Sequence, residues 1–342
     1  MDTKLMTETA RAMVAPGKGL LAADESAGTC KKRFDSVSVE CNEENRRAYR
    51  ELLFTTPGIS EFVSGVILFD ETIRQKTKDG VNFAEYMKKN GIIPGIKVDA
   101  GAHDMALHPG EKVTEGLDKL SERMAEYFKQ GARFAKWRAV ITIGEGIPTQ
   151  ACLDANAHAL ARYSAICQEN SIVPIVEPEV LLDGNHSAET SEQVHLRTLE
   201  TLFTELARQD VILENVILKA SMCVSGKENA KQAGVQEVAE RTLRVLKRTV
   251  PAALPGVVFL SGGQTDENAT AHLDAMNRMG PNPWPLTFSY SRALQAVALN
   301  TWRGQAGNVA AAQKAFGHRA RMNSMAAKGQ WKKDLEKQLA AA

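Results

Sequence analysis

The chain has 342 residues, of which 44% are hydrophobic and 24% are charged, so it holds enough apolar material for one large globular domain. Its 42 basic and 41 acidic residues nearly cancel, and no overall field favours binding to nucleic acid or to an anionic membrane. The N-terminal segment lacks an apolar signal core, and no run reaches the roughly 18 apolar residues of a membrane span, so we expect a cytoplasmic protein.

Short apolar runs and amphipathic segments alternate along the chain. Residues 1–13 predict a helix. After them, eight apolar or β-branched runs bounded by turn residues predict strands. The expected strands are residues 17–26, 63–70, 91–99, 132–141, 171–180, 215–222, 255–263 and 283–291.

Two of the intervening segments have apolar residues at helical spacing. Residues 114–130 predict a helix that stops at Gly131. Residues 190–209 predict a second helix, which begins with a capping box of Thr190 and Gln193. Strands and helices are therefore expected to alternate.

The alternation indicates a parallel sheet covered by helices, and a count of eight strands favours closure into a (β/α)8 barrel, the TIM-barrel fold, over an open sheet. We predict a single α/β domain over residues 1–342. A helical extension at about 1–16 and a tail at about 320–342 are expected to be additions to this barrel.

Charged and polar residues stand at the carboxyl ends of most of the predicted strands. In a TIM barrel these ends share one face, where the active site lies. A single charge at a strand end is more often a solvated residue or half of a weak ion pair, but a ring of charges indicates a site. The residues are Asp24, Lys97, Lys136, Arg138, Glu177, Glu179, Lys219, Ser261, Gly262, Gly263, Ser291 and Arg292.

The spacing within two strands predicts which way these charges point. Lys136 and Arg138 are two residues apart, as are Glu177 and Glu179, so each pair lies on one side of its strand. Because the outer side of a barrel strand is covered by helices, a charge is tolerable only at the open mouth of the interior. Both pairs are therefore expected inside the mouth.

Lys219 is the candidate nucleophile of this ring. It follows the apolar run "VIL" directly. A lysine amine must be neutral to attack a carbonyl, and both burial and a neighbouring cation such as Lys136 favour the neutral form. Lys219 is therefore suited to covalent chemistry.

Two anion sites are expected on opposite sides of the mouth. The loop of Ser261, Gly262 and Gly263 leads into a helix expected near residues 264–276, whose N-terminus, together with Arg292, suits a phosphate. The second expected site consists of Ser26, Arg33 and Lys97. Two such sites imply a substrate with a phosphate at each end.

With these residues in place, the sequence resembles the class I fructose-1,6-bisphosphate aldolases. The shared motifs follow the family order from residue 17 to about 295: "GKGLLAADES", "GIIPGIKVD", "FAKWRAVI", "PIVEPEV", "VILK", "FLSGGQ" and "TFSYSRALQ". The resemblance implies reversible cleavage of fructose 1,6-bisphosphate to dihydroxyacetone phosphate and glyceraldehyde 3-phosphate in glycolysis and gluconeogenesis. It also implies a lysine Schiff base, with no metal or other cofactor.

The resemblance further implies roles for the catalytic residues. Lys219 corresponds to the Schiff-base lysine, Glu177 to the proton shuttle, and Asp24 to the aspartate that orients the sugar hydroxyls. Lys136 tunes the charge near Lys219, and Glu179 helps to hold the lysines. Whether Asp24 or Glu177 removes the proton from the carbon 4 hydroxyl stays open.

The same comparison assigns the two ends of the substrate. It implies that Ser261, Gly262 and Arg292 hold the carbon 1 phosphate, that Arg33 and Lys97 serve the carbon 6 phosphate, and that Arg138 lies near the distal part of the substrate.

Three positions depart from the family pattern. Ala220 stands where many relatives have proline after the lysine, which should not alter the chemistry. Ser291 replaces a glycine whose backbone approaches the phosphate, so we expect the carbon 1 phosphate site to be retuned. The C-terminal "WKKDLEKQLAAA" lacks the terminal tyrosine of animal relatives, which argues against gating by the tail and favours a bacterial type of enzyme.

A metal-dependent barrel and a barrel that only binds sugar phosphates are the alternative functions. A metal-dependent barrel requires clustered ligands, but the seven histidines are dispersed along the sequence. A barrel that only binds sugar phosphates should have lost Lys219 or Glu177, and both are present. Fructose 1-phosphate and sedoheptulose 1,7-bisphosphate remain alternative substrates.

The remaining expectations concern cysteines and assembly. Five scattered cysteines without a Cys-x-x-Cys pair predict reduced thiols instead of disulfides. No nucleic-acid or membrane partner is expected, and a homotetramer is implied only by analogy with the family.

Overall fold

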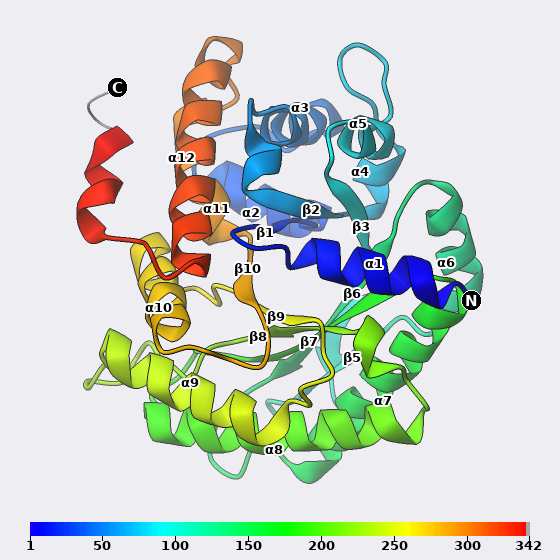
Figure 1. Cartoon of the computed structure of the whole chain (residues 1–342), viewed down its shortest axis with the longest axis vertical. Helices are drawn as coiled ribbons and strands as arrows, with labels where there is room; N and C mark the ends of the chain where they lie inside the picture. Colours follow the sequence, from blue (N-terminus) through cyan, green and yellow to red (C-terminus); the bar gives the residue numbers. More distant parts are fainter. Residues whose placement is uncertain (340–342) are drawn as a thin grey trace.

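Eight parallel strands close into a barrel in this computed structural model, which describes residues 1–339 (Figure 1). Around the barrel they follow the order β1-β10-β9-β8-β7-β6-β3-β2. Their bounds are β1 Gly19–Ala23, β2 Val63–Leu68, β3 Ile93–Lys97, β6 Phe134–Ile141, β7 Val173–Val180, β8 Ile217–Ala220, β9 Gly256–Phe259 and β10 Leu286–Tyr290. Each of the eight expected segments contains one of these strands, so the predicted TIM-barrel fold is confirmed.

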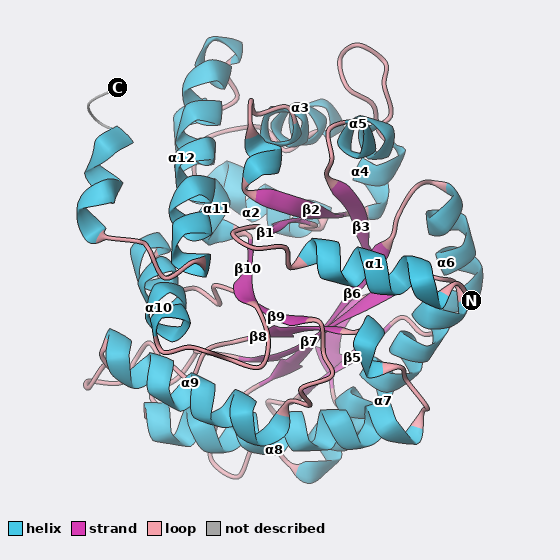
Figure 2. Cartoon of the chain, in the orientation of Figure 1, coloured by secondary structure: helices cyan, strands magenta, loops and turns pink. Residues whose placement is uncertain are grey.

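Helices surround the barrel on its outer side (Figure 2). The α-helices are α1 Thr3–Met13, α2 Ala27–Asp35, α3 Glu43–Phe54, α4 Asp70–Arg74, α5 Phe83–Lys89, α6 Leu120–Lys129, α7 Gln150–Glu169, α8 Ala188–Arg208, α9 Val235–Thr249, α10 Asp266–Arg278, α11 Arg292–Trp302 and α12 Val309–Ala327. Short 3-10 helices are η1 Ile59–Glu61, η2 Leu213–Asn215, η3 Ala306–Asn308 and η4 Lys333–Leu339. An antiparallel hairpin of β4 Gly101–Asp104 and β5 Lys112–Glu115 follows β3.

An apolar layer fills the amino end of the barrel. Phe134, Ile175 and Ile217 are fully buried there in one cluster. The Phe134 ring needs the space that glycine leaves, because a Cβ at Gly95 would lie 2.2 Å from it and a Cβ at Gly65 2.9 Å. Since side chains alternate along a strand, the next inward positions of β6, β7 and β8 belong to the charged residues of the mouth.

Helix α1 closes the amino end of the barrel. It lies in front of the strands in Figure 1, and its Met6, Ala10 and Met13 are fully buried in the same cluster as Phe134. The Ser64 hydroxyl donates a hydrogen bond of 2.6 Å to the Met13 carbonyl and fixes the end of the helix against β2. The predicted helix is thus present, but it is part of the barrel core and not an addition to it.

The predicted start of helix α6 is wrong. The helix begins at Leu120, six residues after the predicted start at Thr114, because residues 112–115 pair with β4 as strand β5. Gly116 then takes a φ of +126°, which breaks the strand before the helix begins.

The predicted capping box of helix α8 is also wrong. The N-cap is Ser187, whose hydroxyl accepts a hydrogen bond of 3.1 Å from the Thr190 backbone N–H. The helix therefore begins at Ala188, two residues before the predicted start. Thr190 lies inside the first turn, where its hydroxyl contacts the Ser187 hydroxyl at 3.1 Å.

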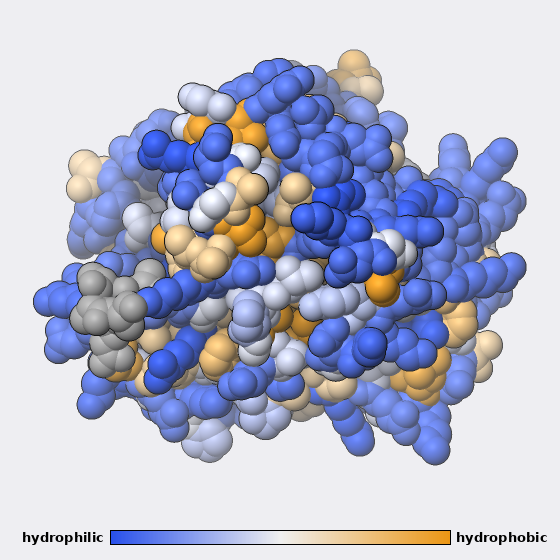
Figure 3. Space-filling view, turned by 90° about the horizontal axis from the view of Figure 1, so that it is seen from above, coloured by the Kyte–Doolittle hydropathy of each residue, from blue (hydrophilic) through white to orange (hydrophobic). Residues whose placement is uncertain are grey.

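The helical shell continues past the expected boundary at residue 320. Helix α12 runs to Ala327 and buries Phe316, Ala320 and Met322 in the main core. Residues 340–342 of the expected tail lie outside the described residues. The face in Figure 3 is mostly hydrophilic with small apolar patches, as expected for the outer sides of amphipathic helices. Within residues 1–339, no helix has the length and apolar character needed to cross a membrane.

Candidate active site

The predicted site residues meet in one cavity of about 380 Å³ at the carboxyl end of the barrel. Of the residues singled out in the sequence, Gly263 is the exception, because it lines a neighbouring cavity. The others that line the central cavity are Asp24, Ser26, Arg33, Lys97, Lys136, Arg138, Glu177, Glu179, Lys219, Ser261, Gly262, Ser291 and Arg292.

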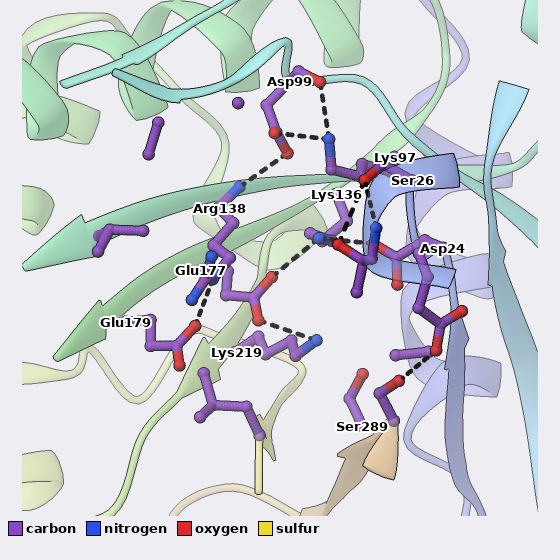
Figure 4. A pocket seen from close by; sticks show the side chains of 18 of the residues that line it. Asp24, Ser26, Lys97, Asp99, Lys136, Arg138, Glu177, Glu179, Lys219 and Ser289 are labelled. Atoms are coloured by element: carbon purple, nitrogen blue, oxygen red, sulfur yellow. Dashed lines mark hydrogen bonds and ion pairs between the residues drawn. The ribbon is translucent and has the colours of Figure 1, made fainter. Parts of the chain in front are cut away.

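Glu177 lies between two lysines at the centre of the cavity (Figure 4). Lys219 Nζ is 2.9 Å from Glu177 Oε1, and Lys136 Nζ is 3.3 Å from Glu177 Oε2. All three side chains are at least 95% buried, and they come from the adjacent strands β6, β7 and β8. The sequence predicted a cation beside Lys219, but its direct contact is the carboxylate that separates it from Lys136.

Lys136 is held in the charged form by two carboxylates. Its Nζ is 2.7 Å from Asp24 Oδ2, so it contacts two carboxylates, whereas Lys219 has an ion pair with one among the described residues. Burial disfavours the charged form of Lys136, but Asp24 and Glu177 outweigh that effect and raise its pKa above the ordinary value. The two central lysines therefore differ in the number of carboxylates that they contact.

The two central carboxyl groups are held in the ionised form. Burial favours protonation of Asp24, but Lys136 and Lys219 outweigh it and lower the pKa from 3.8 to about 2. Burial likewise opposes ionisation of Glu177, and the same two lysines lower its pKa.

Asp24 should make the stability of the fold depend on pH. Because its pKa is lower in the folded chain, its contribution of about 2 kcal/mol is complete above the unfolded pKa near 4 and is lost as pH falls toward about 2. Unfolding midpoints in urea, measured for the wild type and for Asp24→Asn between about pH 6 and 2.5, check this. The difference between the two proteins should shrink as the solution is acidified. Asp79→Asn, at an exposed loop position, is the control. If the difference in unfolding midpoint between Asp24→Asn and the wild type stayed constant across this pH range, the low pKa of Asp24 would be contradicted.

Two further ion pairs flank the centre. Lys97 Nζ lies 2.7 Å from Asp99 Oδ1, and Arg138 Nε donates to Glu179 Oε2 (Figure 4). The resemblance implied that Glu179 holds the lysines, but its ion pair in the structure is with Arg138. Both pairs lie toward the side of the mouth formed by β3, β6 and β7.

Among the cavity residues that were missed in the sequence, Asp99, Ser289 and Glu25 carry polar or charged groups into the site. Asp99 and Ser289 stand two residues from Lys97 and Ser291, so the same alternation that identified Lys136 and Arg138 could have found them. The third, Glu25, is buried next to Asp24 and pairs with Arg33 and Arg50. No spacing signal indicated this pairing, because Arg50 comes from the distant helix α3.

The glycine-rich loop and Arg292 lie together as predicted. Gly262 and Gly263 have φ angles of +57° and +97°, which glycine adopts without strain. A Cβ at Gly263 would lie 3.3 Å from an Arg292 guanidinium nitrogen, so the loop passes close to this arginine.

The expected help from the N-terminus of α10 is not supported by its residues. Thr265 caps the helix by accepting a hydrogen bond of 3.2 Å from the Asn268 N–H. Asp266 and Glu267 occupy the first turn, where they repel an anion. Helix α11, in contrast, begins with the positively charged Arg292, which attracts an anion.

No group of three or more His, Cys, Asp or Glu side chains within residues 1–339 is arranged to hold a metal ion. The five cysteines are free thiols.

Comparison with known proteins agrees with the fold and with the motifs. The family model described as "Fructose-bisphosphate aldolase class-I" matches residues 5–342. The chain is 61% identical over 333 residues to "Probable fructose-bisphosphate aldolase class 1" of Xanthomonas axonopodis pv. citri, covering 97% of this chain and 100% of the relative. It is 52% identical over 322 residues to "Fructose-bisphosphate aldolase 4, cytosolic" of Arabidopsis thaliana, covering 94% and 82%.

A solved structure gives the same result. The fructose-bisphosphate aldolase of Plasmodium falciparum, crystallised in complex with TRAP and a small-molecule inhibitor, superposes with a TM-score of 0.95 at 49% identity. The match covers 96% of this chain and 95% of that one. With the family model matching nearly the whole chain and curated relatives identical at half of the aligned positions or more, the chain belongs to the class I fructose-bisphosphate aldolase family.

Proposed function

We propose that the central cavity is the active site of this fructose-bisphosphate aldolase and that Lys219 forms its Schiff base. The reaction is the reversible cleavage of fructose 1,6-bisphosphate to dihydroxyacetone phosphate and glyceraldehyde 3-phosphate. The observation that supports the assignment best is the placement of Glu177 between a firmly charged Lys136 and Lys219, with the Glu177 oxygen 2.9 Å from the Lys219 amine. This arrangement gives the nucleophile an adjacent proton carrier.

The first half of the reaction forms the imine. The Lys219 ammonium gives a proton to Glu177 and, as the neutral amine, attacks carbon 2 of the open-chain ketose, whose carbonyl oxygen takes up a proton to give a carbinolamine. Glu177 carries protons between the nitrogen and this oxygen, so that water leaves and a protonated imine remains. Lys136 remains an ammonium ion and stabilises the negative charge of Glu177 when Glu177 has released its proton.

The second half breaks the bond between carbons 3 and 4. A carboxylate removes the proton of the carbon 4 hydroxyl, the bonding electrons move into the imine to give an enamine, and glyceraldehyde 3-phosphate leaves. Asp24 is proposed as this base, because its 2.7 Å contact with Lys136 places it beside the centre while Glu177 contacts the Lys219 nitrogen. Protonation of the enamine at carbon 3 and hydrolysis of the imine then release dihydroxyacetone phosphate.

Trapping of the imine tests this assignment. Borohydride added to the wild-type protein in the presence of dihydroxyacetone phosphate should reduce the imine and attach the substrate covalently to Lys219, because reduction makes the carbon–nitrogen bond permanent. Peptide mass spectrometry locates the adduct. The control is Lys247→Met, which removes an exposed lysine of α9 and should leave the adduct in place. An adduct on another lysine, or none in an active protein, would contradict the proposal.

Metal independence is part of the same proposal. A protonated imine accepts the electrons of the broken bond, so the chemistry leaves no task for a Lewis acid. Cleavage of fructose 1,6-bisphosphate should therefore continue at an unchanged rate after prolonged treatment with a chelator, as measured by release of triose phosphate. A loss of activity that added zinc restores would favour the metal-dependent alternative.

The remaining proposals concern substrates, location and assembly. Ser261, Gly262 and Arg292 are proposed to bind the carbon 1 phosphate, with Gly263 in support. Ser26, Lys97 and Arg138 are proposed to serve the distal end. Fructose 1-phosphate and sedoheptulose 1,7-bisphosphate are further candidate substrates. A cytoplasmic location is supported by the name of the cytosolic Arabidopsis relative, and a homotetramer is proposed by family analogy.

A further inference from the structure

Ser291 links two elements that are far apart in the sequence. It stands between β10 and α11 as the N-cap of α11, yet its side chain makes no capping bond with that helix. Instead its hydroxyl donates to Glu25 Oε1 at 2.7 Å and accepts from an Arg33 guanidinium nitrogen at 2.9 Å. The hydroxyl thus connects the end of β10 to the loop after β1 and to α2.

The hydrogen-bonding capacity of this hydroxyl is fully used. Its one proton is directed at Glu25, and its acceptor positions receive Arg33 and the Gln295 side-chain amide, the latter at 3.2 Å. No proton remains for a substrate oxygen. The side chain of Ser291 therefore influences phosphate binding through Arg33 and not by direct contact.

Glu25 is a fixed partner in this arrangement. It is buried, its Oε2 lies 3.0 Å from an Arg50 nitrogen, and its Oε1 accepts from Gln295 at 3.1 Å. Gln295 also donates to the Ala22 carbonyl at 2.7 Å, which ties α11 to β1. Since Glu25 and Arg50 are buried and paired, Arg33 is held against a rigid support.

Arg33 lies on the Arg292 side of the mouth. Besides the central cavity, both arginines line a smaller cavity of about 150 Å³ next to α11. Lys97, with which Arg33 was grouped in the sequence, is instead paired with Asp99 at 2.7 Å and donates to the Asp99 carbonyl at 2.9 Å. Arg33 and Lys97, which were expected at the same end of the substrate, therefore have different partners: Arg33 contacts Ser291 and Glu25, and Lys97 contacts Asp99.

We propose that Ser291 is a positioning residue that fixes Arg33 beside Arg292, so that Arg33 serves the carbon 1 phosphate of the ketose and not the carbon 6 phosphate. This inference rests on the proposed function, in which Arg292 binds the carbon 1 phosphate. It replaces the assignment of Arg33 that the family resemblance implied. The serine that stands at position 291 in place of the family's glycine would thus act by holding Arg33 through its hydroxyl.

Fructose 1-phosphate separates the two assignments, because it carries the carbon 1 phosphate and lacks the carbon 6 phosphate. Ser291→Ala should raise KM about fivefold for fructose 1,6-bisphosphate and by the same factor for fructose 1-phosphate, with kcat changed less than about twofold. Arg33→Met should lower kcat/KM for both sugars about thirtyfold. Lys97→Met should raise KM for fructose 1,6-bisphosphate alone.

Two further variants separate positioning from general stability. Ser291→Thr retains a hydroxyl and should restore a KM within about twofold of the wild type, independently of any change in melting temperature. Ser121→Ala, which removes an exposed hydroxyl of α6, should behave as wild type with both sugars. A KM that followed the melting temperature across the Ser291 variants would overturn the positioning role.

The outcome that overturns the inference differs from one that overturns the proposed function. If Arg33→Met or Ser291→Ala affects fructose 1,6-bisphosphate but leaves fructose 1-phosphate unchanged, Arg33 serves the carbon 6 end and the inference is wrong. The same holds if Ser291→Ala affects neither sugar. In both cases the wild type would still give the borohydride adduct on Lys219, whereas failure of the proposed function would remove that adduct.

Discussion

Replacement of Lys219 by methionine should abolish cleavage, with kcat for fructose 1,6-bisphosphate reduced at least ~10⁴-fold, because the covalent route through the imine disappears. Methionine is close to lysine in length and fits a buried position. The fold should therefore survive, because Glu177 keeps its ion pair with Lys136. Release of triose phosphate, followed in a coupled assay, measures the effect.

The matched variant for this experiment is Lys136→Met, which removes the other amine that contacts Glu177. It should slow the reaction but leave the borohydride adduct on Lys219. Activity of Lys219→Met within tenfold of the wild type would mean that another amine or another mechanism does the chemistry. Circular dichroism and a melting curve on each variant establish that the chain is folded.

Replacement of Glu177 by glutamine should have the second-largest effect, lowering kcat by about 10² to 10⁴-fold with little change in KM. The amide keeps the size of the side chain but cannot carry a proton between the Lys219 nitrogen and the substrate oxygen. It also removes the negative charge that separates two buried lysines, so the unfolding free energy should decrease by about 3 kcal/mol.

Glu179→Gln is the appropriate control, because Glu179 lies on the same strand, two residues away, and pairs with Arg138 instead of a lysine. Its effect on kcat should be at least about tenfold smaller than that of Glu177→Gln. Steady-state kinetics with fructose 1,6-bisphosphate give both parameters. Equal effects of the two substitutions would assign the proton transfer to a different group.

The barrel could be predicted because its evidence is local and repeated. Each strand is a short apolar run between turn residues, and the run of "VIL" before Lys219 shows the pattern in three residues. The two-residue spacing of Lys136 and Arg138 correctly indicated the inner face of β6, since it depends only on the pleat of a strand. The predicted function followed from motifs that are long enough to be specific.

The errors come from interactions between distant segments. The first two residues predicted for α6 belong to strand β5, because pairing with β4 outweighs their helical spacing, and the helix begins only at Leu120. The cap of α8 was shifted because Ser187 and Thr190 are both good capping residues, and only the backbone conformation selects between them.

The sequence predicted which residues line the site, but not which carboxylate forms an ion pair with which cation. Composition and order could indicate that cations and carboxylates share the mouth. Which carboxylate meets which cation depends on the stagger of the barrel, and this stagger placed Glu177 between Lys136 and Lys219. It also placed Glu179 against Arg138. The role of Glu25 depends on Arg50, which reaches it from helix α3.

The position of helix α1 has a consequence for how the chain reaches its final form. Its Met6 and Met13 contact a cluster that includes residues as distant as Val258. Helix α1 can therefore reach its final contacts only after the chain has been synthesised through strand β9. Until then, its apolar side and the open bottom of the unfinished cylinder are both exposed to solvent. An N-terminal truncation would leave this surface permanently uncovered and should give a product that aggregates during expression.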